Sequence, residues 1–243
     1  MQQQLRQEVY EKLALVIDPE LDQSLTELEF INNVEIYGSA VTVSFRLPTY
    51  WCSPNFAFIM AVDIRDRVSE LPWVTDVVVQ LEDHSAADEI NQGIAMRKSF
   101  TETFPHMSNG ELDELRKTFR NKAFVARQER LLRHLIGLGL TDAAIVNLTV
   151  RQLRDFPILE MEGLTLRERY LAIRDELGHN SDPEQRAFVQ LTGESLNLNH
   201  FAGYLADARR TRLSLEFNGH YCRGLFQTRY ATEQIDETEA VKP

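Results

Sequence analysis

The chain has little of what marks several large classes of protein. Its 243 residues include only two cysteines, Cys52 and Cys222. Two thiols do not make a disulfide framework, and their separation gives none of the paired spacings of a structural zinc site. No run approaches the roughly 20 apolar residues needed to span a bilayer, and the start, Met1-Gln2-Gln3-Gln4, lacks the apolar core of a signal peptide. We therefore expect a cytoplasmic protein without a membrane partner.

Positive charge is also scarce. Lysine and arginine total 26 against 37 acidic residues, so the formal net charge is −11. A field of this sign repels phosphates, and we expect no nucleic-acid partner. A glycine-rich phosphate loop is missing too, because Gly137-Leu138-Gly139 ends a predicted helix instead of opening one after a strand. Nucleotide binding is therefore not expected.

The first third of the chain alternates helical and strand patterns. Apolar residues at helical spacing predict a helix over residues 3–16, which Asp18-Pro19 ends because proline disfavours helical geometry in the residue before it. Alternating apolar residues on both sides of Gly38-Ser39 predict a β-hairpin. A second helix is expected over 55–71 and a short β-branched strand over 74–81. The predicted order is αββαβ.

The rest of the chain is predicted to be mainly helical. A long apolar stripe indicates a helix over 111–138. Thr149 with Gln152, and Thr165 with Glu168, fit capping boxes that begin two further helices. Asn218-Gly219 is the strongest short hairpin signal, so the strand-like residues around it predict a terminal β-hairpin.

These patterns predict an α+β protein with an N-terminal αββαβ domain, followed by a mainly α-helical domain with a terminal β-hairpin. The expected organisation is a domain over residues 1–84, a linker or partner-binding arm over 85–110, a helical domain over 111–231, and an acidic tail over 232–243.

Cys52 is the first candidate functional residue. It lies in a loop just before the second predicted helix, in Leu47-Pro48-Thr49-Tyr50-Trp51-Cys52-Ser53-Pro54. Unpaired N–H groups at a helix N-terminus carry partial positive charge, which favours the thiolate that binds metals or attacks electrophiles. The alternative is a buried structural thiol, since unpaired cysteine is among the most buried residue types.

Cys222 and His220 form a second candidate pair. In a strand they would share one face, about 7 Å apart, as two-residue strand spacing gives. A thiolate and an imidazole on one face can both bind iron or zinc. Packing of Cys222 in the core is the alternative.

Asp18 and Glu20 flank Pro19 and could act as a carboxylate pair. A proline between two carboxylates after a helix usually serves capping and rigid geometry, and Asp18 could also bind or orient a metal. An enzyme that uses Cys52 as nucleophile needs a nearby base, and no histidine is identifiable as one. We therefore do not expect an enzyme.

Three sequence features together carry a family resemblance. They are Asp18-Pro19-Glu20-Leu21 after the first helix, the segment Leu28 to Ile31 before the hairpin, and Thr49-x-x-Cys52-x-Pro54 before the second helix. In the αββαβ order they resemble the iron–sulfur cluster assembly domain family, the small domain of PaaD-like and SufT-like proteins. The resemblance covers about residues 3–84, roughly a third of the chain.

The resemblance implies a non-enzymatic factor that helps install iron–sulfur clusters or related metal centres in an apo-metalloenzyme client. It makes Cys52 the reactive or ligating residue of the motif that Thr49 begins, and its cargo iron or an iron–sulfur cluster, held transiently. Tyr50-Trp51 stand where the family has smaller residues, so Trp51 either shields the thiol or offers an aromatic contact to a partner. The helical extension suggests a dedicated client. This part of the chain also resembles proteins encoded beside multicomponent di-iron monooxygenases, which implies such an oxygenase as the client.

Two hypotheses arise from these features. In the first, the chain is a maturation factor in which Cys52, with Cys222 and His220, holds iron or a cluster. Since one thiol cannot complete four-coordinate iron, a homodimer or a client residue would supply the rest. In the second, the chain is a metal-free chaperone that recognises an oxygenase subunit through its helical half and Trp51.

Overall fold

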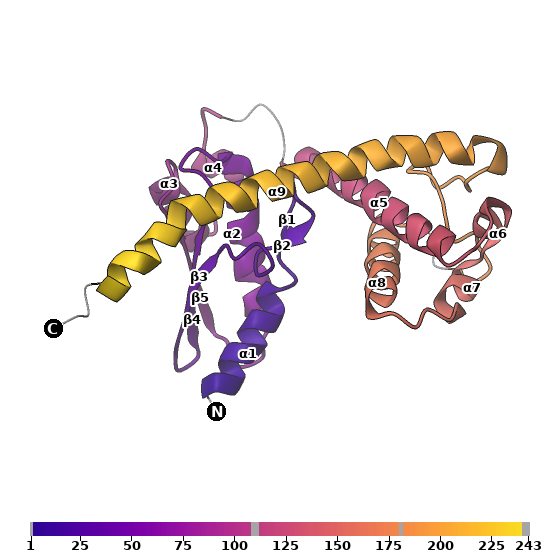
Figure 1. The fold of residues 1–243 in the computed structure, drawn as a ribbon. Helices are drawn as coiled ribbons and strands as arrows, with labels where there is room; N and C mark the ends of the chain where they lie inside the picture. The colour runs from indigo at the N-terminus through magenta and orange to yellow at the C-terminus, as the bar shows by residue number, and fades with distance from the viewer. Residues whose placement is uncertain (1, 108–111, 180–181, 240–243) are drawn as a thin grey trace. The chain divides into compact units, whose positions relative to one another are not determined.

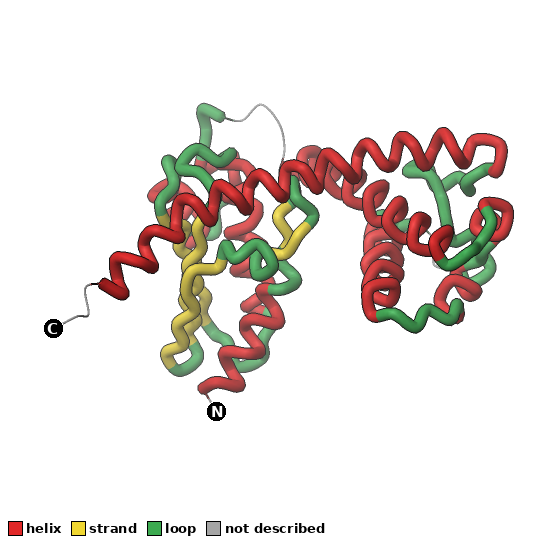
Figure 2. The backbone as a smooth tube through the Cα atoms, viewed as in Figure 1, coloured by secondary structure: helices red, strands yellow, loops and turns green. Residues whose placement is uncertain are grey.

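The computed structural model describes residues 2–107, 112–179 and 182–239. Among these residues, strands occur only in the first third, and the other two thirds are mostly helical (Figures 1 and 2). The predicted α+β class is therefore confirmed. The elements are α1 (Gln2–Leu13), β1 (Ile17–Asp18), β2 (Gln23–Ser24), β3 (Ile31–Tyr37), β4 (Ala40–Arg46), α2 (Pro54–Ser69), β5 (Asp76–Glu82), α3 (Ala87–Ala95), α4 (Phe100–Thr103), α5 (Leu112–Gly137), α6 (Asp142–Asn147), α7 (Val150–Asp155), α8 (Met161–Glu176), the 3₁₀ turn η1 (Leu198–His200) and α9 (Phe201–Glu239).

The chain divides into two compact units. Unit 1 comprises residues 1–115 and 217–243, and unit 2 comprises residues 116–216. The boundaries fall inside α5 and α9. The sequence-based division at residues 84 and 110 differs from this one because the chain returns to unit 1 through α9, which no local pattern reveals.

Unit 1 is built on a sheet with the order β3-β4-β5. β3 and β4 form the predicted antiparallel hairpin, in which Gly38 takes the left-handed backbone conformation that glycine adopts readily, with φ of 63°. β4 and β5 are parallel and joined through α2. The predicted αββαβ order is thus correct, with the short β1–β2 pair as an addition. Since β4 and β5 run the same way, the loops that follow them leave from the same edge of the sheet.

The prediction that residues 85–110 form a linker or arm is wrong in the central part of this segment. It contains α3 and α4, and Ile90, Ile94 and Phe100 are buried in the core of unit 1. Asn91 on α3 also bonds β5 along the strand edge that does not pair with β4. Its Oδ1 accepts the Leu81 N–H at 2.8 Å, and its Nδ2 donates to the Leu81 carbonyl at 3.0 Å. This side chain satisfies backbone groups that an edge strand would leave unpaired.

The predicted terminal hairpin is also wrong, because α9 runs through it without a break. One face of α9 carries residues at helical spacing that are buried or packed on the core: Leu215, Gly219, Phe226 and Tyr230. Burial of this face outweighs the local Asn218-Gly219 turn signal. Gly219 serves close packing instead of a turn. A Cβ there would lie 3.3 Å from Gln23 Oε1.

Unit 2 packs α5 to α8 and the first part of α9 around its own core. Of the two predicted capping boxes, that of Thr149 with Gln152 is present at the start of α7. Thr165 instead lies inside α8, where its hydroxyl donates to the Met161 carbonyl at 3.0 Å. Across the described residues, no helix has the length and apolarity required to cross a bilayer.

Candidate functional site

The site forms where the loops after β4 and β5 leave the sheet. The first loop carries Thr49 and Cys52, and the second carries Ser85 and His84. A backbone hydrogen bond from Ser85 N to the Tyr50 carbonyl, 2.9 Å long, joins the loops. Parallel pairing of two strands therefore brings together residues that are far apart in the sequence.

Cys52 lies in the turn that opens α2, as the sequence predicts. Its N–H donates to the Thr49 carbonyl at 3.3 Å, and its Sγ lies 3.3 Å from Thr49 Oγ1. Ser53 is the N-cap residue and Pro54 begins the helix. The thiol is partly buried against the core of unit 1. Thr49 thus holds the Cys52 side chain in place, which gives the Thr-x-x-Cys spacing a physical role.

His84 is a site residue that the sequence did not reveal. Its Nδ1 accepts the Ala86 N–H at 3.1 Å, so its Nε2 carries the proton and donates to the Cys52 carbonyl at 2.8 Å. Burial lowers the pKa of His84, which favours this neutral form. The imidazole therefore fixes the Cys52 backbone and does not bond its sulfur. No spacing in the sequence could have predicted this contact across two loops.

Asp18 has the capping role that its position before Pro19 predicts. Its Oδ1 accepts the N–H groups of Glu20 and Leu21 at 2.9 and 3.0 Å, and its side chain is buried. Burial raises the pKa of Asp18 from 3.8 to about 7, although both N–H groups oppose the rise. Glu20 contributes a smaller increase through its negative charge. The two carboxylates thus interact, with Asp18 the buried partner.

Cys222 on α9 belongs to the same neighbourhood as Cys52. Both cysteines pack against the core of unit 1, and the pKa of Cys222 responds to the charges of Cys52, Asp18 and Glu20. Burial is the larger influence, and together these effects raise that pKa to about 11. The Cys222 thiol is therefore protonated at neutral pH. The sequence left open whether Cys222 and Cys52 lie in one region. They do so because of how α9 packs on unit 1.

His220 does not join Cys222. The predicted pairing assumed a strand, whereas residues two apart in an α-helix point about 200° apart. His220 is accordingly exposed while Cys222 is partly buried. The prediction of a shared face is wrong, and His220 is removed from the candidate ligand set.

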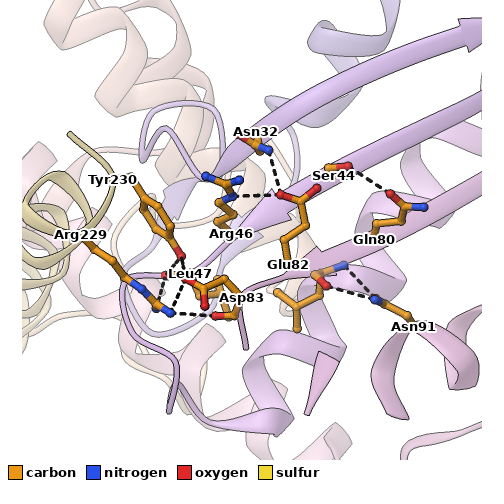
Figure 3. A network of polar contacts seen from close by, with 11 residues as sticks. Asn32, Ser44, Arg46, Leu47, Gln80, Glu82, Asp83, Asn91, Arg229 and Tyr230 are labelled. Carbon is orange, nitrogen blue, oxygen red and sulfur yellow. Dashed lines mark hydrogen bonds and ion pairs between the residues drawn. The ribbon is translucent and has the colours of Figure 1, made fainter. Parts of the chain in front are cut away.

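Side chains of α9 attach the helix to the loops of the site (Figure 3). Arg229 pairs with Asp83 at 2.5 Å and donates to the Asp83 carbonyl at 3.0 Å, while the Tyr230 hydroxyl lies 3.1 Å from Asp83 Oδ2 and donates to the Leu47 carbonyl at 3.3 Å. Leu47 follows β4 and Asp83 follows β5. The helix therefore bridges the same two loops that position Cys52.

A second set of contacts lies toward the other end of the docked helix segment. Arg223 Nη1 donates to Gln23 Oε1 at 2.5 Å, and Gln23 pairs with Asp18 across β1 and β2. The ring of Phe226 lies 5.0 Å from that of Phe30. Cys222 thus lies directly before the α9 segment, Arg223 to Tyr230, that these contacts hold against the rest of unit 1.

Trp51 adds an exposed aromatic surface beside the thiol. Its side chain is 78% exposed, and its ring meets that of Tyr50 edge-on at 5.0 Å. Trp51 therefore faces solvent and does not bury the Cys52 region as a core residue would. An exposed tryptophan with a neighbouring tyrosine has the composition of a protein-binding hot spot.

The arrangement offers two thiols and a nearby buried carboxylate. Within residues 2–107, 112–179 and 182–239, no group of three or more histidine, cysteine, aspartate or glutamate residues has the arrangement of a metal site. Two thiols fit the soft-ligand chemistry of iron and iron–sulfur clusters as a partial ligand set.

Comparison with known proteins connects this site to a family. The search of curated proteins and the search of solved structures each gave no match to the chain. A family model described as iron–sulfur cluster assembly protein matches residues 6–81, which include the Asp18 and Cys52 motifs and nearly all of the strands β1 to β5. The predicted resemblance of the N-terminal third to the iron–sulfur cluster assembly family is thus confirmed.

Proposed function

We propose that this protein is a maturation factor that holds iron or an iron–sulfur cluster as cargo through Cys52 and Cys222 and passes it to a client metalloenzyme. The observation that carries the proposal is that α9 brings a second thiol to the Cys52 region of the domain that matches the assembly family. The minimal domain contains one of these thiols, and the extension supplies the other.

The electrostatics of Cys222 suit transient binding. Because its pKa is about 11, the thiol keeps its proton at neutral pH and is a poor ligand until a cation arrives. Binding of iron replaces that proton, which leaves to solvent, and the positive metal reverses the unfavourable interaction with Asp18. Affinity should therefore rise with pH and stay modest near pH 7, as cargo transfer requires.

The remaining ligands would come from a second molecule. Two thiols supply two of the four ligands that tetrahedral iron takes, so a second copy of this chain or a residue of the client completes the site. Trp51, exposed beside Cys52, is the proposed contact for that molecule. The proposed client is an apo-oxygenase, with a multicomponent di-iron monooxygenase as the candidate that the sequence resemblance suggests.

The first test is anaerobic reconstitution of the full chain with iron and sulfide. Iron and sulfide content, absorption and Mössbauer spectra would be compared for wild type, Cys52→Ser, Cys222→Ser and His220→Ala. We expect iron binding to fall at least tenfold in both cysteine variants. His220→Ala is the matched control, because His220 lies two residues from Cys222 but is exposed, and it should bind as wild type does.

Loss of iron in Cys52→Ser alone would remove Cys222 from the site and leave the single motif thiol. Equal iron content in all four proteins would overturn the proposal.

A metal-free chaperone is the second candidate, and the exposed Trp51–Tyr50 pair favours it. It requires that Cys52→Ala leave client binding unchanged, while Trp51→Ala weakens it at least tenfold. The maturation factor instead requires Cys52 for activation of the client, whatever the binding affinity. Activation measured beside binding separates the two.

A further inference from the structure

Unit 2 contains a cleft that the cysteine site does not use. It has a volume of about 640 Å³ and is lined by the C-terminal half of α5, the start of α8 and α9 residues up to Glu216. This volume lies in the range of small-molecule sites. Four glutamates and three arginines line it, together with His134. The walls thus carry one negative charge in excess.

A buried carboxylate in the cleft wall is only half satisfied. Glu129 is 0% exposed, and its Oε2 receives the Arg212 Nε–H at 2.5 Å. Among the described residues, its Oε1 has no hydrogen-bond partner although it is fully buried. An unsatisfied buried acceptor on a charged group costs more than a neutral one. The cleft lining therefore includes a buried carboxylate whose Oε1 has an unmet hydrogen-bonding capacity.

The partners of Glu129 are themselves fixed. Arg212 also pairs with Glu216, whose other oxygen lies 3.3 Å from Arg130 Nε. Rotation of Arg212 to serve both oxygens of Glu129 would break its pair with Glu216. This network therefore leaves the hydrogen-bonding capacity of Glu129 Oε1 unmet, because Arg212 cannot serve Oε1 without giving up another ion pair.

His134, which also lies on α5, packs against the first turn of α8. A Cβ on Gly163 would lie 2.2 Å from His134 Nε2, so glycine is what allows the ring to approach the helix this closely. Within the part of the chain that the structure describes, Nε2 is buried and has no hydrogen-bond partner. A second residue of the lining therefore has a buried polar atom with unmet hydrogen bonding.

We infer that this cleft binds a primary ammonium group on an alkyl stem, with the ammonium donating to Glu129 Oε1. An ammonium has three N–H donors and a single positive charge, which matches the buried acceptor and the one excess negative charge of the walls. Leu138 and Leu166 in the lining give the stem an apolar contact. The group could belong to a small amine or to a lysine side chain of a partner protein.

The test is a titration of the full chain, followed by ¹⁵N NMR of the backbone amides. The probes are n-butylammonium, a capped peptide with one central lysine, and tetramethylammonium, which has the charge but no N–H donor. We expect saturable shifts at residues of α5 and α8 with butylammonium or the lysine peptide, and none with tetramethylammonium at the same ionic strength. Response to butylammonium alone would identify a small amine, and response to the peptide would identify a protein lysine.

Two variants test the role of Glu129. Glu129→Gln should weaken binding at least tenfold, because it removes the charge and keeps the shape. Glu168→Gln makes the same change at an exposed position of α8 outside the lining and should alter binding less than threefold. Equal binding in wild type and Glu129→Gln would overturn the assignment.

Leu138→Trp keeps the test decisive if Glu129→Gln does not fold. Leu138 is 44% exposed, so a larger side chain is tolerated there and should narrow the cleft. Unchanged binding in Leu138→Trp, or the absence of saturable shifts in wild type, would show that the cleft holds water only.

Discussion

The two units treat buried polar groups in opposite ways. Among the described residues of unit 1, the buried polar side chains lie in strands and turns, and none lies on a helix: they are Asp18, Asp22, Ser24, Ser44 and His84. In unit 2, Gln128, Glu129 and Arg174 are all 0% exposed on the helices that make its core. Buried polar side chains therefore lie in the strands and turns of unit 1 but on the core helices of unit 2.

The hydrogen bonds of Arg174 show how buried polar side chains stabilise unit 2. Arg174 donates to the carbonyls of Ala187, His179 and Arg186 at 3.1 to 3.2 Å, and so organises the irregular segment after α8. That segment has little regular backbone pairing of its own, so side chains satisfy its carbonyls. Polar side chains in unit 2 replace the pairing that a sheet provides in unit 1.

Among the variants that test this difference between the units, Arg174→Met should have the largest effect on stability. Methionine keeps much of the apolar volume but removes the Arg174 donor from the His179 and Arg186 carbonyls, while the Ala187 carbonyl keeps its bond from the Tyr170 hydroxyl. We therefore expect the free energy of unfolding of unit 2 to fall by about 3–5 kcal/mol. Urea unfolding followed by far-UV circular dichroism measures it. Both tryptophans, Trp51 and Trp73, lie in unit 1, so their fluorescence follows that unit separately.

Arg151→Met is the control, since Arg151 makes an exposed ion pair with Glu184 and should change stability little. If Arg174→Met were equally mild, the carbonyls would be satisfied without Arg174, and the contrast between the units would fail.

Asp18→Asn tests how a buried polar side chain affects the stability of unit 1. The pKa of Asp18 is raised from 3.8 to about 7 by burial, so the folded state holds a proton that the unfolded state releases between these values. The stability that this proton confers is present below pH 3.8 and is lost as the pH rises through 7. Asparagine keeps the oxygen that accepts the two N–H groups and has no proton to lose. At pH 8 we therefore expect Asp18→Asn to be more stable than wild type by about 2–4 kcal/mol.

The measurement is urea unfolding followed by tryptophan fluorescence at pH 4, 6 and 8. The advantage of the variant should grow across this series and level off above pH 7. Asp66→Asn, at an exposed position on α2, is the matched control and should show no such trend. A constant difference between Asp18→Asn and wild type at all three pH values would mean that Asp18 ionises as readily in the folded protein as in the unfolded one.

The sequence was sufficient where function depends on local pattern. Periodicity gave α1, β3, β4, α2 and β5 of unit 1, and the spacing from Thr49 to Cys52 located the thiol before α2. The placement of Asp18 before Pro19 gave its capping role. Each of these features is determined within a few residues, so one sequence contains the information.

The rest depends on contacts between distant residues. The hairpin prediction failed because Asn218-Gly219 is a local turn signal, whereas packing of Phe226 and Tyr230 on unit 1 is not visible locally. His84 was missed for the same reason, since its partner is a backbone carbonyl in another loop. The His220–Cys222 pair depended on the hairpin and was lost with it.

The smallest expected effect compares the two predicted capping boxes. Thr149 accepts the Gln152 N–H at 3.2 Å at the start of α7, so Thr149→Ala should lower the free energy of unfolding of unit 2 by about 1 kcal/mol. Thr165 has the same spacing to a glutamate but lies one turn inside α8, where alanine is the better helix former. Thr165→Ala should therefore be neutral or stabilise unit 2 by up to about 0.5 kcal/mol. Far-UV circular dichroism in urea measures both. Equal losses in the two variants would mean that α8 begins at Thr165 in solution, whereas opposite signs would show that tertiary packing, and not the capping pattern, decides where this helix starts.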